Sequence, residues 1–577
     1  MPLISKNDII LAAHLDRLGL RFTADLLMQA LGLNKMNRLY EKLSGKQGLD
    51  FLDAALKELN IRYIVAPDDL NHIPASGSFI TVSNHPFGIL DGMLLIRIIS
   101  QKRPDYKVMA NFLLQRAEPV RHYFISVDPF EGQNRKRQGR NIRGLKDALQ
   151  HLKSGAPLGI FPAGEVSTFQ NGFRNIGDKE WPLSIIKFIK KAEQPVVPIY
   201  FHGSNRLIFH LLGKIHPALR TASLPSEVFH QRGEIKIRIG HPVSAWEQQK
   251  FTVEQLGKFL RAKVYALGRP LSEKKTLQQK LLQLKKPQKI IDPLPVQRLR
   301  EEIDNLQNRK LQVKDHLEVY LAPSSSIPNI LKEIGRLRET TYRAAGEGTN
   351  KSVDLDDFDK YYEHLFLWDR KNEKIAGAYR IGKGDEIFMS YGIKGFYTST
   401  LFHYDEAFTP YLKGCLELGR SFVIEEYQKK TFPLFLLWKS IVQFLQQHPQ
   451  YRYLLGPVSI SSSYSELSRS LIIQFIKRFY YDAALAQLVH ARRAYQVNER
   501  DELGIILDTF SDNLNELDRL IADIEPSRFR IPVLLKKYIR QNARIIGFNL
   551  DPKFNNALDG LMILDLKNLP ESNAYRL

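Results

Sequence analysis

The sequence has few of the features that mark secreted or membrane-spanning proteins. It contains a single cysteine, Cys415, among 577 residues, which excludes a disulfide framework and is typical of a reducing compartment. No uncharged apolar stretch is long enough to cross a bilayer. The first residues, MPLISKNDIILAAHLDRL, carry Asp and His within their apolar run, so we expect neither a signal peptide nor a membrane span there. These absences predict a cytoplasmic protein that is peripheral on the inner face of the bacterial cytoplasmic membrane.

Negative charge is also in short supply. The chain has 83 Lys and Arg against 62 Asp and Glu, a formal net charge of +21. Such an excess favours an acidic partner: nucleic acid, anionic lipid or an acidic carrier protein. The sequence has neither a Cys/His finger spacing nor an aromatic RNA-binding strand motif, so we expect no nucleic-acid partner. An anionic membrane surface and an acyl carrier protein remain as expected partners.

The pattern of apolar residues predicts two different α/β domains, because 577 residues exceed one ordinary core. Leucines at helical spacing indicate an N-terminal helical cap over residues 1–60, which either packs on the next domain or dips into a membrane. Short β-rich runs alternate with helical patterns over residues 61–265. A Lys-, Gln- and Leu-rich segment, residues 266–315, is expected to be a helical linker, and residues 316–577 form a second α/β domain.

Two polar strings each follow a strand-like run in the first domain. The first runs from Asn84 to Asp91 and contains His85; the second runs from Phe161 to Ser167. A His with an acid shortly after it can take the proton from a substrate hydroxyl, while the Asp orients the imidazole. No Ser or Cys nucleophile is needed if the acyl group arrives as a thioester. The string around His85 can also be an ordinary loop, since Asn and His are common in loops.

The two strings together with a third, Val197-Pro198-Ile199, give residues 70–245 a resemblance to the glycerolipid O-acyltransferases related to lysophosphatidic acid acyltransferase. The resemblance implies that His85 deprotonates the acceptor, that Asp91 orients it, and that backbone amides near Gly164 stabilise the oxyanion. It implies substrate-binding roles for a larger set: Asn84, Phe161, Pro162, Gly164, Glu165 and Ser167.

Two departures from that family pattern stand out. Five residues separate His85 from Asp91 where the family has four, so the loop must bulge, and Gly88 can supply the positive φ that a bulge requires. The second string has Ala163 and Glu165-Val166 where the family carries Glu and Thr-Arg. Without that Arg, the loop has no guanidinium to bind a phosphate through two hydrogen bonds. We therefore expect the acceptor to be a hydroxyl on a lipid less anionic than a glycerol phosphate.

A basic run lies between the two strings. It is either a solvated helix start or a docking site for an acidic carrier or lipid headgroups, and its members are Arg135, Lys136, Arg137, Arg140 and Arg143.

The second domain carries three further strings: residues 356–359, 377–380 and 417–423. They resemble the N-acyltransferase fold of the acyl-homoserine lactone synthases and the ornithine lipid N-acyltransferases, which are branches of the acetyltransferase-like superfamily. The resemblance implies that Glu417 is the base for an amine, and that the site is shaped by Asp356, Asp359, Arg380, Arg420 and Ser421. The same charges can instead form structural ion pairs.

One absence concerns the acyl donor. Acetyltransferases that use coenzyme A usually carry a glycine-rich loop for the pyrophosphate, but Val423 is followed by Ile-Glu-Glu-Tyr-Gln-Lys-Lys. Without a glycine nest for a diphosphate, acyl carrier protein is the expected donor, with acyl-CoA as the alternative. We expect no cofactor and no metal.

Residues 333–339, 345–349 and 456–461 resemble bacterial proteins once labelled hemolysins, and the whole arrangement resembles the bifunctional ornithine lipid synthases and their amino-acid-lipid relatives. This implies N-acylation of an amino acid with a 3-hydroxyacyl group by the C-terminal domain, then O-acylation of the 3-hydroxyl of that lyso-lipid by the N-terminal domain. Ornithine is the amino acid implied first; glycine, serine and lysine stay open.

Two other functions compete with this one. The first is a lysophospholipid or glycerol-phosphate acyltransferase whose C-terminal domain only docks the acyl carrier. The second is a membrane-binding, hemolysin-like protein, although the sequence offers no spanning segment or amphipathic β pattern for it.

Overall fold

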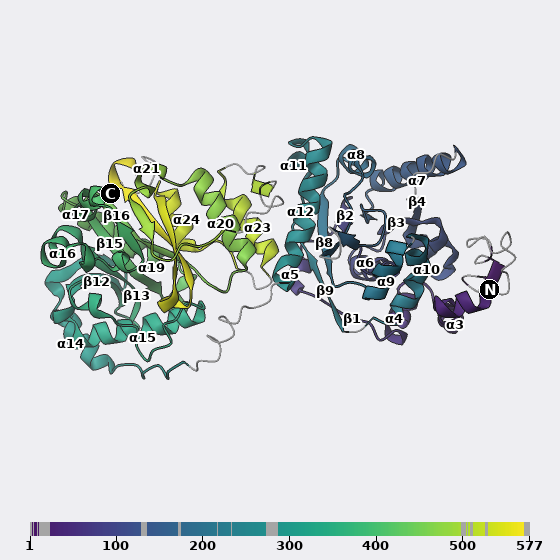
Figure 1. The fold of residues 1–577 in the computed structure, drawn as a ribbon. Coiled ribbons are helices and arrows are strands. Elements are labelled where there is room, and N and C mark those ends of the chain that lie inside the picture. Colours follow the sequence, from purple (N-terminus) through teal and green to yellow (C-terminus); the bar gives the residue numbers. More distant parts are fainter. Residues whose placement is uncertain are drawn as a thin grey trace. The chain divides into compact units, whose positions relative to one another are not determined.

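The computed structural model describes residues 3, 5–7, 10, 23–127, 135–170, 175–215, 217–231, 233–272, 287–497, 504, 506–507, 512–525 and 529–569. The chain divides into two compact units (Figure 1). The N-terminal unit comprises Met1–Ser272 together with Arg500–Thr509 and Ala522–Arg528. The C-terminal unit comprises Glu273–Glu499, Phe510–Ile521 and Phe529–Leu577. Both units are α/β, as the sequence predicts.

The N-terminal unit is built on a seven-stranded sheet in the order β1-β9-β8-β2-β5-β3-β4. Neighbouring strands are parallel except β8 and β9, which are antiparallel. The strands are β1 (Arg62–Val65), β2 (Ile80–Ser83), β3 (Lys107–Asn111), β4 (Phe124–Val127), β5 (Leu158–Ile160), β8 (Val196–His202) and β9 (Glu234–Ile239). A separate hairpin pairs β6 (Thr168–Gln170) with β7 (Asn175–Gly177). Since β2 and β5 are parallel neighbours, their carboxyl ends bring residues 84 and 161 to one edge of the sheet, where open α/β sheets place ligands.

Helices cover both faces of this sheet. One apolar cluster joins Leu52 and Leu94 to Val197, and the other joins Ile186 and Leu260 to Val82. The helices of the unit are α2 (Ala24–Ala30), α3 (Leu33–Lys42), α4 (Gly48–Glu58), α5 (Pro67–Leu70), α6 (Ile89–Ser100), α7 (Arg135–Lys153), α8 (Leu183–Ala192), α9 (Leu207–Ile215), α10 (Pro217–Val228), α11 (Ala245–Gln249) and α12 (Val253–Ser272).

The expected helical cap is helical where the structure describes it. Helix α4 buries Phe51, Leu52 and Leu56 in the first of the two clusters. This part of the cap therefore packs on the neighbouring domain. Of the leucines that suggested the cap, those before residue 23 lie outside the described residues.

The C-terminal unit is built on an eight-stranded sheet in the order β10-β11-β12-β13-β15-β16-β19-β18. Only β15 and β16 are parallel neighbours among its described strands; the others pair antiparallel. The strands are β10 (Lys310–Lys314), β11 (Leu317–Pro323), β12 (Glu363–Asp369), β13 (Lys374–Lys383), β15 (Cys415–Val423), β16 (Tyr453–Ile460), β18 (Arg544–Asp551) and β19 (Ala557–Asp565). Strands β14 (Phe402–Tyr404) and β17 (Val489–Ala491) form a small second sheet.

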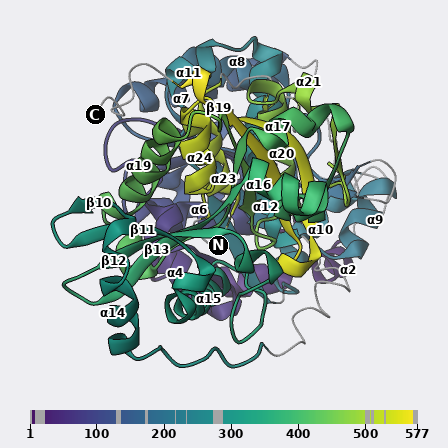
Figure 2. The same cartoon turned by 90° about the vertical axis from the view of Figure 1, so that its left-hand side faces the viewer.

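Alternate residues of β13 face opposite helical layers, as the period of two in a strand requires. Ala378 packs in a cluster with Ile334 of α15 (Pro328–Ala344). The Tyr379 hydroxyl instead lies 3.3 Å from that of Tyr538 in α24 (Val533–Arg540). Helices α15 and α19 lie on opposite sides of these strands (Figure 2). The helices are α14 (Val296–Asp304), α15 (Pro328–Ala344), α16 (Gly384–Tyr391), α17 (Thr409–Lys413), α18 (Glu425–Gln428), α19 (Phe432–Gln447), α20 (Glu466–Phe479), α21 (Ala483–Ala486), α23 (Leu514–Ile524) and α24 (Val533–Arg540).

Strand β15 has an irregularity that shapes one end of this sheet. Its parallel ladder with β16 ends at the pair Glu417 and Leu455. Against β13, its register shifts after Gly419, and Arg420 takes a left-handed φ of 49°. One extra residue is thereby inserted into β15, which is a β-bulge, and bulges commonly re-aim a side chain beside a site.

The segment expected to be a helical linker is only partly described. Helix α12 extends to Ser272, residues 273–286 lie outside the described part, and α14 and strand β10 occupy most of residues 296–314. The strand β10 pairs with β11 and so belongs to the second sheet. Within the described residues, no helix combines the length and apolar character needed to cross a membrane.

Candidate functional site

His85 and Asp91 form a contact pair at the carboxyl end of β2. His85 Nδ1 lies 2.9 Å from Asp91 Oδ2, and the imidazole is 18% exposed while the carboxylate is wholly buried. The contact on Nδ1 leaves Nε2 to face a substrate. This is the arrangement in which a carboxylate orients a His that takes a proton from a hydroxyl, and then stabilises the resulting cation.

The bulge that the sequence predicts between these residues is present. Gly88 has a φ of 76°, a conformation that costs glycine little. The amides of Phe87 and Gly88 donate to Asp91 Oδ2 at 2.8 and 2.9 Å. Burial raises the pKa of Asp91, and the hydrogen bond and charge of His85 oppose that rise. A Cβ at position 88 would lie 2.7 Å from Leu224 Cδ2, so a larger residue fits there neither in conformation nor in space.

The loop after β5 packs directly on His85. The Phe161 ring stacks on the His85 imidazole at 4.1 Å between centroids, with 27° between the planes. The Ser167 amide donates to the His85 carbonyl at 2.8 Å. Gly164 has a φ of 69°, and its amide donates to the Phe161 carbonyl at 3.0 Å. That amide is thus occupied in a turn in this conformation, and its expected part in an oxyanion site stays a prediction.

The remaining predicted residues of this site have contacts within the protein. Both ends of the Asn84 amide bond to the Phe201 backbone, at 2.9 and 2.8 Å, which ties the end of β2 to β8. Pro162 is buried in the loop. Glu165 lies 2.5 Å from Lys179 Nζ in an ion pair. Their roles toward a substrate stay predictions.

Asp178, which sequence reasoning missed, joins the two strings. Its Oδ1 accepts a hydrogen bond from the His85 amide at 3.2 Å and from Ser167 Oγ at 2.6 Å. The side chain is 1% exposed, and burial raises its pKa. Its own amide donates to the Tyr265 hydroxyl at 2.7 Å. Because one carboxylate oxygen holds both loops, Asp178 acts as a positioning residue for His85.

We expect Asp178→Ala to reduce O-acyl transfer by about 10- to 100-fold, because small misplacements of a catalytic group carry penalties of that order. Asp178→Asn keeps the shape and one acceptor oxygen, so we expect it to restore most of the rate. The measurement is kcat for acceptor acylation, with a thermal unfolding curve for each variant. A merely structural role would lower the unfolding midpoint of both variants and leave kcat per folded molecule unchanged.

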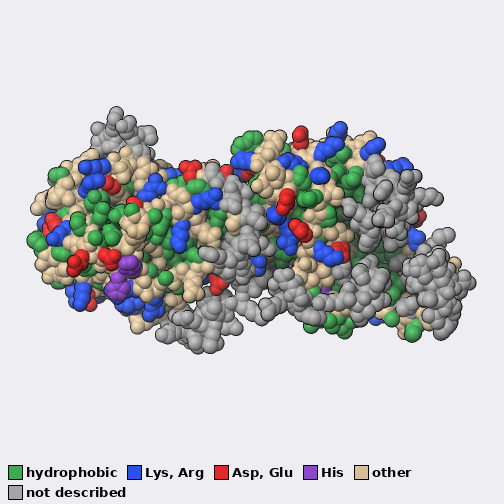
Figure 3. Space-filling model, turned by 45° about the horizontal axis from the view of Figure 1, so that its top comes forward, with side chains coloured by type: hydrophobic (Ala, Val, Ile, Leu, Met, Phe, Trp, Pro, Cys, Tyr) green, Lys and Arg blue, Asp and Glu red, His purple; other side chains and the backbone are tan. Residues whose placement is uncertain are grey.

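The basic run falls mostly outside what can be described. Arg135, Lys136, Arg137 and Arg140 lie in α7, but their side chains are outside the described residues. Arg143 is exposed on the same helix. Described Lys and Arg side chains are spread over the visible face of both units rather than gathered in one patch (Figure 3). Docking of a carrier or membrane on α7 stays a prediction.

In the C-terminal unit, the predicted charges form a buried network beneath one face of the sheet. Arg380 Nη1 lies 2.6 Å from Asp356 Oδ1 and 3.3 Å from Asp359 Oδ1, and Arg338 Nη1 lies 2.7 Å from the same Asp359 oxygen. Neither arginine side chain is exposed. Burial alone raises the pKa of Asp359, but the two guanidinium groups hold it well below its ordinary value. Asp356 also caps the short helix Asp357–Lys360.

Arg420 and Ser421 lie at the bulge of β15. The Arg420 guanidinium sits between the Tyr397 and Phe554 rings, 5.1 and 5.0 Å from their centroids. The Ser421 carbonyl accepts a hydrogen bond from the Tyr342 hydroxyl at 3.0 Å. The bulge therefore directs Arg420 away from the ladder and into an aromatic slot.

Glu417 is 1% exposed on β15, opposite Gly382 of β13. Its carboxylate accepts hydrogen bonds from the Tyr397 amide at 3.0 Å, the Thr398 amide at 2.7 Å and the Tyr362 hydroxyl. These contacts fix the turn at residues 397–398. The part of Glu417 as base for an amine stays a prediction, and in this conformation its oxygens are occupied by the protein.

One group among the described residues has the spacing of a metal site: His72, His241 and Asp523. Asp523 Oδ1 already contacts His241 Nδ1 at 2.5 Å, and its Oδ2 lies 3.2 Å from Lys263 Nζ. The ammonium group next to the carboxylate supplies the positive charge that a metal would bring, so the residues do not fit a metal.

Comparison with known proteins gives matches for both halves of the chain. A family profile described as "Acyltransferase" matches residues 3–273, and one described as "Acetyltransferase (GNAT) domain" matches residues 337–438. The chain is similar to the glycine N(alpha)-acyltransferase of Bacteroides thetaiotaomicron, at 30% identity over 50% of this chain and 89% of that protein. It is similar to the lyso-glycine lipid O-acyltransferase of the same organism, at 25% identity over 43% of this chain and 90% of that protein. Among solved structures it is similar to the 1-acyl-sn-glycerophosphate (LPA) acyltransferase PlsC from Thermotoga maritima, at 18% identity over 44% of this chain and 90% of that one, with a TM-score of 0.28.

Proposed function

The chain belongs to the acyltransferase family of the bacterial glycine N(alpha)-acyltransferases, and from this premise we propose that it makes an amino-acid lipid by two acyl transfers. The C-terminal unit joins a 3-hydroxyacyl group to the amine of an amino acid, and the N-terminal unit then esterifies the 3-hydroxyl with a second acyl chain. The order follows from the chemistry, because the hydroxyl acceptor of this lipid exists only after the amide is made.

The observation that carries the proposal is the His85–Asp91 pair in a unit separate from the acetyltransferase-like one. His85 Nε2 takes the proton of the 3-hydroxyl, whose oxygen attacks the thioester carbonyl, and the thiol of the carrier leaves. A buried carboxylate on Nδ1 favours the protonated imidazole that forms in this step. The loop from Phe161 to Ser167 lies against the imidazole, which supports the proposal that this loop holds the acceptor.

Glycine is the first amino acid to test. Two relatives carry glycine in their names, whereas ornithine is implied by resemblance of motifs alone. Serine and lysine are the other members of the class that the sequence leaves open. The donor is an acyl thioester, with acyl carrier protein expected from the missing diphosphate loop and the net charge of +21. We further propose that the protein works at the inner face of the cytoplasmic membrane as a peripheral protein, since its product is a lipid.

The test is mass spectrometry of lipids from a heterologous host that expresses the full chain, followed by assay of the purified protein with 3-hydroxyacyl carrier protein. Glycine, ornithine, serine and lysine are offered in parallel, and lysophosphatidic acid is offered as a competing acceptor. We expect an N-acyl amino acid and its O-acylated product, with glycine preferred. Acylation of lysophosphatidic acid with no amide product would instead support a phospholipid acyltransferase whose second unit only docks the carrier. Vesicle leakage without an acyl donor would support a hemolysin-like protein.

A further inference from the structure

Three carboxylates that the sequence did not single out gather where β15 and β16 separate. Asp559 of β19 faces Ser459 of β16, whose hydroxyl donates to Asp559 Oδ1 at 2.8 Å. Asp551 ends β18, and its Oδ2 accepts from the Tyr397 hydroxyl at 3.3 Å. Glu347 follows α15 and is half-buried. Asp551 and Asp559 are 4% and 3% exposed, so the protein keeps strongly polar groups in a place where water is largely excluded.

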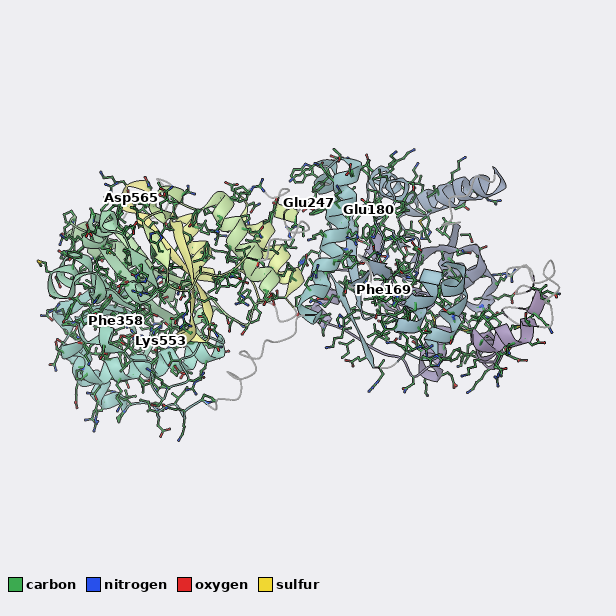
Figure 4. All side chains as sticks on the ribbon, viewed as in Figure 1. Phe169, Glu180, Glu247, Phe358, Lys553 and Asp565 are labelled. Carbon is green, nitrogen blue, oxygen red and sulfur yellow. The ribbon has the colours of Figure 1, made fainter. Side chains whose placement is uncertain are left out.

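The loop that carries Glu347 is anchored to the same strands. The Gly346 carbonyl accepts from Asn555 Nδ2 at 2.7 Å. A Cβ on Gly346 would lie 2.6 Å from the hydroxyl oxygen of Ser463 and 3.1 Å from that of Ser461. Residues 345–349 and 456–461, two of the segments with the hemolysin-like resemblance, thus meet at this point. Phe358 and Lys553 are labelled on the ribbon of the C-terminal unit in Figure 4.

Arg420 adds a guanidinium that makes two long ion-pair contacts but no hydrogen bond among the described residues. No described residue accepts a hydrogen bond from its guanidinium; the nearest carboxylate oxygens, of Asp354 and Asp356, lie 3.4 and 3.5 Å away. Its Nε is buried and has no hydrogen-bond partner among the described residues, although Asp354 Oδ2 lies 3.4 Å away. A buried guanidinium with free donors is costly unless it is paired. The planar guanidinium of an arginine is well suited to bind a carboxylate through two parallel hydrogen bonds.

Glu347 offers a carboxyl group that has no hydrogen-bond partner among the described residues. No described residue hydrogen-bonds its carboxylate, and Asp559 Oδ2 likewise accepts no hydrogen bond within the described part of the chain. A zwitterion presents the complementary pair of charges, a carboxylate for Arg420 and an ammonium for the two acids.

We propose that Arg420, Asp559 and Glu347 form the amino-acid site of the C-terminal unit, in which Arg420 binds the substrate carboxylate and the pair Asp559–Glu347 binds the ammonium and removes its proton. This inference rests on the proposed N-acyl transfer and assigns the base of that reaction to Asp559 and Glu347 in place of Glu417.

The raised pKa values of Asp559 and Glu347 suit a general base for an amine. Burial and the nearby charge of Asp551 raise the pKa of Asp559 from 3.8 to about 7, and Ser459 and Arg420 oppose that rise. Burial and the charge of Asp559 raise the pKa of Glu347 from 4.5 to about 8. A carboxylate in this range is a much better proton acceptor than an ordinary one, because general bases are most effective with a pKa near the working pH.

The reaction balances with these groups. The ammonium gives one proton to the carboxylate pair, and the neutral amine nitrogen attacks the thioester carbonyl carbon. The carbon–sulfur bond then breaks, the amide forms, and the thiolate of the carrier leaves and takes up a proton. The net release is one proton per amide, which the pair passes to solvent. No oxidant, reductant or metal is required.

The first test compares three charge-removing variants of the full chain: Asp559→Asn, Glu347→Gln and Glu417→Gln. The assay uses glycine and 3-hydroxyacyl carrier protein, and Asp357→Asn, which changes an exposed acid beside Asp356, is the matched control. We expect kcat for amide formation to fall at least 100-fold in Asp559→Asn and at least 10-fold in Glu347→Gln. The wild-type rate should rise with pH up to about 8, and both variants should lose this rise. A folded Asp559→Asn protein with wild-type kcat and pH profile would overturn the inference, as would a loss confined to Glu417→Gln.

The second test addresses Arg420 with two probes that lack a carboxylate, glycinamide and ethanolamine. Wild type should prefer glycine to either probe. We expect Arg420→Met to raise KM for glycine at least 20-fold, to leave KM for the acyl carrier within threefold, and to abolish the preference. A retained preference in folded Arg420→Met would contradict the assignment. If wild type acylates no amino acid at all, the proposed function fails instead, so the two failures are distinguishable.

A third measurement tests the pKa of Asp559 through the pH dependence of protein stability, without an activity assay. The folded protein holds its proton up to about pH 7, whereas the unfolded chain releases it near 3.8. Wild type should therefore lose stability relative to Asp559→Asn as pH rises through this window. The charged and polar groups that face Asp559 are the same in both proteins: Asp551, Ser459, Arg420, Tyr397 and Glu347. Parallel midpoints from pH 4 to 8 would show that Asp559 does not carry a raised pKa, and would count against it as the base.

Discussion

Replacing His85 by Ala should stop O-acyl transfer and leave N-acyl transfer intact, so that the monoacylated amino acid accumulates. The imidazole is our proposed proton acceptor in the N-terminal unit, and a positioned general base contributes about 100- to 10,000-fold. Its contact with the buried Asp91 at 2.9 Å means that Asp91→Asn should lose a large part of the same rate, because the amide does not favour the imidazolium. The measurement is the ratio of diacylated to monoacylated product by mass spectrometry.

The matched control is His230→Ala, which removes an exposed histidine of the same unit whose Nδ1 lies 2.7 Å from the Ser226 carbonyl. It should leave the product ratio unchanged. The assignment of units would be wrong if His85→Ala lost the amide and kept the ester activity on added N-acyl amino acid. An equal loss of both products with a lowered unfolding midpoint would place the effect of His85 in folding.

Replacing Arg380 by Met should destabilise the C-terminal unit by about 3–5 kcal/mol, the usual result of breaking a buried ion pair by removing one partner. The side chain is fully buried, and its loss leaves Asp359 paired with Arg338 alone and Asp356 with only the longer contact to Arg420 at 3.5 Å. The three rings that surround the guanidinium, those of Phe358, Tyr362 and Tyr397 at 5.0 to 5.7 Å, lose a cation–π contact as well. Denaturant unfolding followed by tryptophan fluorescence measures the change.

Lys360→Met supplies the comparison for this variant, since Lys360 pairs with Asp357 two residues from the network but both side chains are largely exposed. Exposed ion pairs contribute little, so its unfolding midpoint should match wild type. A stable Arg380→Met protein with weakened amino-acid binding would show that Arg380 serves the substrate rather than the fold.

Local patterns in the sequence predicted the elements that local chemistry controls. The run before Asn84 is β2, the run before Phe161 ends β5, and residues 317–323 form β11, because short β-rich runs bounded by turns have few alternatives. The contact between His85 and Asp91 was also predictable. The two residues are six positions apart, His85 after β2 and Asp91 in the first turn of α6, and the glycine between them allowed the bulge that the spacing required.

Contacts between distant segments were not predictable in the same way. Asp178 meets His85 across 93 residues, and nothing in the string after β7 marks it as different from other surface acids. Asp559 lies in a strand between apolar residues, and its partner Ser459 is 100 residues away. Arg420 adopts a left-handed backbone without being glycine, so the usual signal for a bulge was missing. For Glu417 the motif identified the residue, but it could not predict the three hydrogen bonds that its carboxylate accepts within the protein.

The shared oxygen of Asp178 has a consequence for changing what this enzyme accepts. The His85 amide and the Ser167 hydroxyl both donate to this oxygen. If the loop before Ser167 holds the acceptor as proposed, an alcohol bulky enough to push that loop outward also moves the imidazole out of alignment. Acceptor scope and turnover are therefore mechanically linked. Redesign toward other alcohols has most freedom at Glu165, whose side chain is partly exposed, because Ala163 is buried in the apolar core and Gly164 has a left-handed φ.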